Sequence, residues 1–251
     1  MKFYILASGS AGNCTIFEND NHQLLMIDCG LSYVEIQRRM NSVGLNINDV
    51  KALLVTHLHN DHCLSLKAFP NDIVYMNIAT GMSEYHLFDY YQTLNILDYE
   101  IYTIPASHDS PGTTGFIIKH NNEKLAYLTD TGYIHENIQR MINNCNQYLI
   151  ESNHDPRMLM LTKRPLYLKN RILSPNGHMS NKDCAVVLGN VIGPSTKEIV
   201  FIHRSREANS EEMIMATFNE TMKQMDVDVS NIKVSIAKQD SVIESQLLKV
   251  S

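Results

Sequence analysis

The sequence predicts an α+β fold, a sandwich with its sheets inside and its helices outside. Short apolar runs joined by turns dominate the first sixty residues, and strand patterns alternate with helical patterns after that. Hydrophobic residues make up 44% of the 251 residues and charged residues 19%, which is sufficient for a large core. No linker, repeat or low-complexity tract interrupts the chain, so we expect residues 1–251 to form a single domain.

The N-terminal elements are predicted from their turns and caps. Asp20-Asn21 is a hairpin-type turn between two apolar runs. Ser32 and Glu35 form a capping box at the start of a helix that Gly44 ends. A later helix begins at residue 61, runs toward residue 69 and stops at Pro70. The strands expected here are Phe3–Ala7, Thr15–Glu18, Leu24–Asp28 and Ala52–Val55.

The rest of the chain alternates between strand and helix patterns. Asn121-Asn122 marks another hairpin turn. The strands expected are Ile73–Met76, Ile101–Pro105, Gly115–Lys119, Leu125–Thr129, Tyr148–Glu151, Ile199–His203 and Val234–Ala237. The helices expected are 80–90, 135–144, 155–162, 180–191 and 210–225.

Residues 56–62, Thr-His-Leu-His-Asn-Asp-His, follow the strand at Ala52–Val55 and carry four potential metal ligands. Alternate residues of an extended chain point to one side, so His57, His59 and Asp61 converge. His62 joins them only if the chain turns at this point. Asn60 is a good N-cap for a helix that starts at Asp61, and such a helix would provide the turn. The alternative is a set of surface histidines. Without an ion, however, three histidines and an aspartate would repel and desolvate one another, which favours a metal site.

Other apolar strands also end in potential ligands. The strand ends in question lead to His108, Asp130, Glu151 and His203, and His178 precedes a predicted helix. Each one alone is more often an ordinary polar strand end. Because functional groups in layered folds gather on loops at one edge of a sheet, their recurrence indicates one shared site.

Charge and cysteine content restrict the class of protein. The net charge of −6 disfavours nucleic acid, although residues 163–171 carry four basic groups and no acid, and Arg204 and Arg206 form a second basic pair. Each basic group is either a solvated face or a rim that contacts phosphates. Five scattered cysteines without a CxxC pair favour a reducing cytoplasm. No apolar run has the length of a membrane span.

These motifs resemble those of the metallo-β-lactamase superfamily, and within it the YycJ/WalJ-like exonuclease branch. The matching segments are Ser8–Asn13, Asp28–Gly30, Thr56–His62, Thr129–Gly132, Glu151–Asp155, Gly177–Asn181 and His203–Asn209. The last segment departs from the branch at Arg204 and Ala208, neither of which is a ligand. The resemblance implies a four-layer αββα sandwich and a dinuclear metal-dependent hydrolase, most specifically a phosphodiesterase that digests DNA from the 5′ to the 3′ end.

The resemblance also implies a role for each site residue. His57, His59 and His108 would hold one divalent ion, Asp61, His62 and His203 a second, and Asp130 would bridge them. Zinc, manganese and iron all suit such ligands. The pair of ions would lower the pKa of a shared water, and the resulting hydroxide would attack phosphorus.

Further residues are expected around this pair. Asp61 would be essential to catalysis, and His178, oriented by Glu151, would protonate the leaving group. The substrate contacts expected are Ser8, Ser10, Asn13, Ser180 and Asn209, and His154 and Asp155 would orient ligands. Two alternatives stay open: a hydrolase of a small phosphodiester, ester or thioester, and a binding protein that keeps the fold without catalysis. The oligomeric state is left open.

Overall fold

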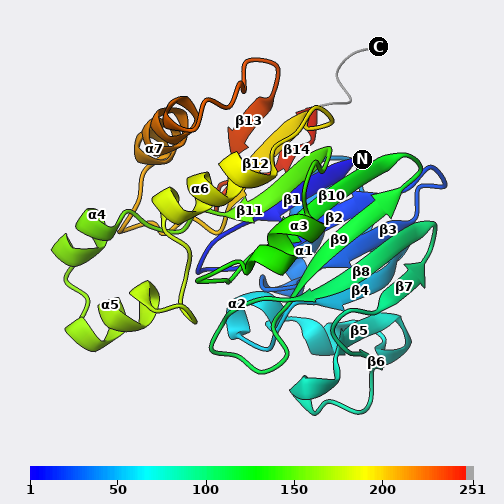
Figure 1. The fold of residues 1–251 in the computed structure, drawn as a ribbon. Coiled ribbons are helices and arrows are strands. Elements are labelled where there is room, and N and C mark those ends of the chain that lie inside the picture. Colours follow the sequence, from blue (N-terminus) through cyan, green and yellow to red (C-terminus); the bar gives the residue numbers. More distant parts are fainter. Residues whose placement is uncertain (247–251) are drawn as a thin grey trace.

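Two seven-stranded sheets lie face to face in residues 1–246, the part of the chain that the computed structural model describes (Figure 1). The first sheet has the order β14-β1-β2-β3-β4-β5-β6. Its strands are β1 (Phe3–Ala7), β2 (Cys14–Glu18), β3 (Leu24–Ile27), β4 (Val50–Val55), β5 (Val74–Asn77), β6 (His86–Phe88) and β14 (Ile243–Glu244). The hairpins predicted at residues 20–21 and 121–122 are confirmed, since β2 pairs antiparallel with β3, and β9 (Thr114–His120) pairs antiparallel with β10 (Glu123–Leu128).

The second sheet has the order β13-β12-β11-β10-β9-β8-β7. Its strands are β7 (Thr93–Ile96), β8 (Tyr99–Pro105), β9 (Thr114–His120), β10 (Glu123–Leu128), β11 (Gln147–Glu151), β12 (Glu198–Ile202) and β13 (Lys233–Ile236). Strands β10 to β13 pair in parallel, so their carboxyl ends meet at one edge.

Helices lie outside the two sheets, and some of them cover the outer faces. They are α1 (Tyr33–Ser42), α2 (Asn60–Cys63), α3 (Glu136–Met141), α4 (Pro156–Leu161), α5 (Leu166–Leu173), α6 (Asn181–Val191) and α7 (Glu211–Gln224). Ile36 of α1 is buried against the first sheet, and Leu188 of α6 and Phe218 of α7 are buried against the second. A third apolar cluster, which includes Phe17 and Phe116, fills the space between the sheets. The predicted αββα sandwich is therefore confirmed.

The Ser32 half of the capping box predicted for α1 is confirmed, whereas the Glu35 carboxylate pairs with Arg38 and Arg39 and does not close the box. The Ser32 side chain accepts a hydrogen bond from the Glu35 backbone N–H at 3.3 Å. Gly44 follows the helix with a φ of +76°, a left-handed conformation that glycine adopts at no steric cost. None of the helices in residues 1–246 is both long enough and apolar enough to cross a bilayer.

Two helix predictions are wrong. Residues 80–90 contain the edge strand β6, which pairs in parallel with β5, and the Tyr75 and His86 rings stack with centroids 4.7 Å apart. Tertiary pairing overrides local propensity in this segment. The helix expected to run toward residue 69 is the single turn α2 followed by a 3-10 turn, Leu66–Ala68, and the residue at the N-cap position of α2 is His59.

Three elements were not predicted at all: α5, β14 and β7, the strand that pairs antiparallel with β8. Helix α5 lies in the basic stretch 163–171, where the density of charged residues hid a short apolar face. Strand β14 has only two residues, and it forms only by pairing with β1 at the edge of the first sheet. Neither α5 nor β14 has a strong local signal, because each depends on contacts with distant residues.

Candidate metal centre and active site

The predicted ligands come from loops that follow four strands at one edge of the sandwich. The loop after β4 carries residues 56–62, and the loops after β8, β10 and β12 carry His108, Asp130 and His203. Asp28, Asp130 and His203 have φ angles of 61°, 49° and 54°, a left-handed conformation unusual outside glycine. Such conformations cost about 1–3 kcal/mol each and gather at functional sites.

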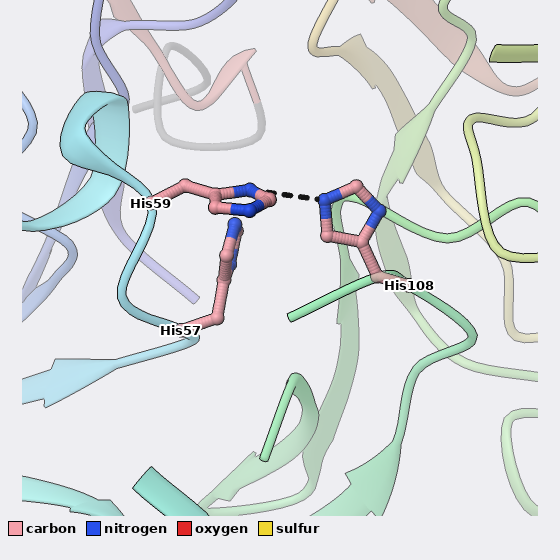
Figure 2. A group of neighbouring side chains, drawn as sticks. All are labelled: His57, His59 and His108. Carbon is pink, nitrogen blue, oxygen red and sulfur yellow. Dashed lines mark hydrogen bonds between the residues drawn. The ribbon is translucent and has the colours of Figure 1, made fainter. Parts of the chain in front are cut away.

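The first group consists of His57, His59 and His108. Figure 2 shows the three rings facing one another, with His57 and His59 on the loop after β4. His108 Nε2 lies 3.2 Å from His59 Nδ1, and one nitrogen of each ring lies within 4.8 Å of the others. His57 Nε2 is buried and has no hydrogen-bond partner in the described structure. Three such nitrogens directed at one point are suited to a metal ion.

The second group consists of Asp61, His62 and His203. Asp61 Oδ2 lies 3.7 Å from His62 Nε2 and 3.7 Å from His203 Nε2. His203 Nε2 is buried and, like His57 Nε2, has no hydrogen-bond partner in the described structure. Buried polar atoms normally have a partner, so both orphaned nitrogens fit ligand positions.

Asp130 lies between the two groups. Its Oδ1 is 3.7 Å from His108 Nε2 and 3.6 Å from His203 Nε2, and its Oδ2 is 3.0 Å from His62 Nε2. Burial opposes ionisation of Asp130, but the His203 and His62 rings hold the pKa of its carboxyl well below the ordinary value. It is therefore a carboxylate within reach of both groups.

The seven side chains of the two groups and Asp130 together are suited to binding divalent metal ions. Burial and the neighbouring His62 ring hold the pKa of His57 well below its ordinary value, so its ring is neutral and has a lone pair for a ligand bond. Imidazole nitrogens and carboxylate oxygens suit zinc, manganese and iron. The structure brings the predicted ligands together in the predicted groups. Their role as ligands stays a prediction.

Asp28 and Thr56 support the second group and were not predicted as site residues. The Asp28 carboxylate is fully buried and accepts hydrogen bonds from the Thr56 backbone N–H at 2.8 Å, from the Thr56 hydroxyl and from His62 Nδ1 at 2.7 Å. This leaves His62 Nε2 directed toward Asp61 and Asp130. The signal in the sequence was an acidic residue ending an apolar strand.

Close packing explains why the third residue of the Asp28–Gly30 motif is glycine. A Cβ at this position would lie 1.6 Å from the carbonyl oxygen of Asp61. The backbone N–H of Gly30 donates to Asn13, and that of Asn13 donates to Asp61. The loop that carries the second ligand group is therefore held by direct backbone contact, which a larger residue would prevent.

Replacing Asp28 with alanine should destabilise the protein and weaken metal binding. The change leaves the His62 ring without its buried partner, which should cost about 3–5 kcal/mol of unfolding free energy, and metal affinity should fall by about 10–100-fold. Chemical denaturation and metal titration measure the two effects. Asp72→Ala, at an exposed position, is the control and should change stability by less than about 0.5 kcal/mol. Equal metal affinity in both variants would show that Asp28 does not support a metal site.

Glu151 and His178 are in contact, as predicted. Glu151 lies fully buried at the end of β11, and its Oε1 accepts hydrogen bonds from His178 Nδ1 at 2.8 Å and His203 Nδ1 at 2.9 Å. Its Oε2 accepts from the Thr131 backbone N–H at 2.8 Å. Burial opposes ionisation, but the His178 and His203 rings lower the pKa of Glu151 to about 2. One carboxylate therefore orients both a candidate ligand and a candidate acid; the bond to His203 was not predicted.

Two of the predicted substrate contacts on the loop after β1 are occupied by internal hydrogen bonds. The Ser8 side-chain oxygen accepts from the His203 backbone N–H at 2.7 Å. The Asn13 amide donates to the Gly9 and Asp61 carbonyl oxygens and lies 3.0 Å from His62 Nε2. Only Ser10 of this loop trio is exposed. Ser8 and Asn13 are therefore bonded to loops that carry candidate ligands, and contact with substrate stays a prediction for all three.

The remaining predicted contacts are also structural. Ser180 caps α6, accepting from the Asp183 N–H and donating to the Asp183 carboxylate. Asn209 is buried and exchanges hydrogen bonds with Asn181. Asp155 caps α4. The sequence motifs identified these positions, and their short polar side chains make helix caps and buried amide pairs within the protein.

The basic stretch 163–171 is mostly neutralised within the protein. Arg164 pairs with Glu207 at 3.1 Å, and Arg171 pairs with Asp109, the residue that follows His108. Lys169 is buried, and its ammonium donates to the carbonyl oxygens of Met160 and Thr162. The stretch therefore anchors α5 to α4 and to the active-site loop, and it offers little free charge for a phosphate rim.

Comparisons with known proteins agree with this geometry. The family model described as Beta-lactamase superfamily domain matches residues 24–203. Exodeoxyribonuclease YycJ of Bacillus anthracis is 34% identical over 238 residues, which cover 89% of this chain and 90% of that protein. Exodeoxyribonuclease WalJ of Streptococcus pneumoniae is 31% identical over 244 residues, which cover 91% of this chain and 90% of that protein.

A solved structure shares the fold. The metallo-β-lactamase fold protein YhfI from Bacillus subtilis superposes with a TM-score of 0.70 at 14% identity, over 97% of this chain and 99% of that chain. The similarity extends over both sheets and their helices, so the αββα sandwich is common to the two proteins.

Proposed function

This chain belongs to the β-lactamase superfamily, as its motifs predicted, and we propose that it is a dinuclear metal-dependent exodeoxyribonuclease. The observation that carries the proposal is the pair of ligand groups joined by Asp130, with a histidine–carboxylate pair beside them. Two related proteins named exodeoxyribonucleases match nearly the whole chain. We further propose 5′-to-3′ polarity and a location in the cytoplasm, where five unpaired cysteines would stay reduced.

The ligand groups define what the metals would contribute. His57, His59 and His108 would hold one ion and Asp61, His62 and His203 the other, with Asp130 between them. Two bound divalent ions supply a nucleophile from water at neutral pH and stabilise the charge that develops on the phosphoryl oxygens. Zinc, manganese or iron would serve, because all three accept imidazole and carboxylate ligands.

The chain itself supplies the proton for the leaving group. His178 Nδ1 is held by Glu151, so Nε2 is the ring atom free to face the substrate. When the bond from phosphorus to the leaving oxygen breaks, that oxygen takes the proton from Nε2, and the Glu151 carboxylate keeps the ring oriented throughout. The Glu151 bonds to His203 and Thr131 hold the carboxylate in place.

A hydrolase of small phosphodiesters is the second candidate. The net charge of −6 and the internal pairing of the basic stretch 163–171 both favour a substrate with few phosphates. Both candidate functions use the same ligand groups. They differ in the surface beside these groups, because only an exonuclease must accommodate a nucleic-acid strand there. Esters and thioesters would be hydrolysed by the same chemistry, but they lack the phosphate that a basic surface recognises.

Metal analysis and a panel of end-labelled substrates test the proposal. The purified protein should contain about two divalent ions per chain, and it should release nucleotides from one end of single- or double-stranded DNA. A chelator should stop the release, and added metal should restore it. Turnover of bis-p-nitrophenyl phosphate with no action on any polynucleotide would favour the second candidate. Protein that binds no metal would count against both.

A further inference from the structure

A hollow of about 420 Å³ lies next to the loop that carries His108. Its lining includes Tyr91, Pro105, Ser107, Tyr133, His135 and Asn137. Ser107 directly precedes His108 in the chain, so one wall of the hollow continues into a candidate metal ligand of the first group.

The walls of the hollow are bonded to each other and to the active-site loops. The Thr131 hydroxyl accepts from the Ser107 backbone N–H at 3.1 Å and donates to the Tyr133 carbonyl at 2.8 Å. The Thr131 backbone N–H donates to the Glu151 carboxylate, and the Ser107 hydroxyl donates to the Asn176 side chain at 3.0 Å. These bonds fix the hollow relative to the carboxylate that orients the candidate acid.

Exposed aromatic side chains are concentrated in this hollow. Among the phenylalanines and tyrosines of residues 1–246, the exposed ones are Tyr91, Tyr133 and Tyr167. Tyr91 and Tyr133, each 48% exposed, both line the hollow. Aromatic rings carry a large apolar surface that is normally buried in a core or a contact. Two exposed rings at one place beside a metal centre therefore indicate a binding surface.

The rings are held in defined orientations. The Tyr133 and His135 rings have their centroids 4.8 Å apart and their planes at 83°, an edge-to-face contact that orients both of them. Tyr91 has a φ of +62°, and its backbone N–H donates to the Thr103 carbonyl at 2.8 Å. A left-handed backbone is unfavourable for tyrosine, and residues held in this conformation gather at functional sites.

The lining has the chemistry of a site for a flat, uncharged ring. None of the described residues that line the hollow is Asp, Glu, Lys or Arg, although 19% of the chain is charged. A phosphate would find no charged partner there. A nucleobase, in contrast, can stack on the tyrosine and histidine rings and present its polar edge to the Ser107 hydroxyl and the Asn137 amide.

We propose that this hollow holds, by stacking, an unpaired base of the strand that the metal centre cleaves. The inference rests on the proposed nuclease function, because a nucleic-acid substrate brings bases next to the scissile phosphate. Stacking tolerates every base, since each has a π-face. It also supplies affinity that does not depend on phosphate contacts, which a chain with a net charge of −6 makes poorly.

Strands with one abasic residue test the inference. In wild-type protein, an abasic residue at one of the first few positions from the cleaved end should lower kcat/KM for the first cleavage by about 5–100-fold. The variant Y91L/Y133L keeps apolar bulk without flat rings and should reduce this cost to less than about twofold, whereas Y91F/Y133F should keep it. The control Y167L alters an exposed tyrosine outside the hollow and should also keep it. Both strands are compared within one protein, so a general loss of activity cancels in the ratio.

Other outcomes are equally informative. If no abasic position costs wild type more than about twofold, or if the cost survives in Y91L/Y133L, the inference is overturned while the exonuclease function stands. Y133L replaces the double variant if that protein does not fold, and it should at least halve the cost. If no polynucleotide is cleaved, the proposed function fails, and binding of a strand that carries 2-aminopurine near its end still decides. Stacking quenches this fluorescent base, so quenching by wild type and Y91F/Y133F alone supports the hollow, and equal quenching by Y91L/Y133L, or none by wild type, overturns it.

Discussion

Replacing Asp61 with alanine should abolish hydrolysis and remove about one metal ion per chain. Asp61 belongs to only one of the two ligand groups. Its Oδ2 lies 3.7 Å from both His62 Nε2 and His203 Nε2. The loss of kcat should exceed about 100-fold, because even residues that only support a ligand contribute about 10–100-fold. The His57, His59 and His108 group contains no atom of Asp61, so one ion should stay bound. Metal analysis of the purified variant, together with steady-state rates on DNA, measures both effects.

The protein offers a control for this experiment. Asp61 has a side chain that is 26% exposed, so the substitution removes a carboxylate from the rim of the site and leaves the core packing intact. Asp72→Ala removes one carboxylate from an exposed position and should retain full activity and full metal content. An Asp61→Ala variant that still binds the full complement of metal would show that Asp61 is not a ligand, and full activity would eliminate it from the catalytic site.

Replacing His178 with glutamine should slow DNA cleavage by about 10²–10⁴-fold and leave metal binding unchanged. Glutamine keeps a polar group beside Glu151 but cannot donate a proton to the leaving oxygen. His178 Nδ1 lies 2.8 Å from the Glu151 carboxylate, which also accepts hydrogen bonds from His203 and from the backbone N–H of Thr131. The ring should therefore act in proton transfer. A fall in metal content would instead identify His178 as a ligand in a group with Asp130, Glu151 and His203.

The leaving group separates proton transfer from a structural role. p-Nitrophenolate departs without a proton, so His178→Gln should slow bis-p-nitrophenyl phosphate turnover by less than about tenfold. A structural defect would slow both substrates equally, and that result would contradict the proposed acid. His22→Gln is the matched control, since His22 Nδ1 also bonds a carboxylate, that of Glu18 at 2.6 Å, on an exposed surface. It should be fully active on both substrates.

The fold and the ligand candidates were predictable because their signals are local, and the division of these candidates into two groups followed from the family resemblance. Alternating or continuous apolar runs identified nearly all the strands, and a turn or cap marked the boundaries of β2, β3 and α1. The ligand candidates were found because each stands directly after an apolar strand, and parallel strands bring their carboxyl ends to one edge. The prediction for residues 80–90 was wrong because an edge strand there forms by pairing with β5.

The supporting residues could not be assigned from local signals. Ser8, Asn13, Ser180 and Asn209 were all expected to contact substrate, and all four are buried and bonded within the protein. The sequence does not distinguish a serine or asparagine that caps a helix from one that joins two loops or binds a phosphate. Which role it takes depends on the distant atoms that surround it, and these are known only after the chain has folded.

The sequence alone determined the fold class and the chemistry of this protein, because strand periodicity and the types of ligand are properties of short segments. Only the tertiary structure showed that Asp28 and Glu151 hold His62 and His203 in place. These contacts join residues that are distant along the chain, and only the packing of the two sheets brings them within bonding distance.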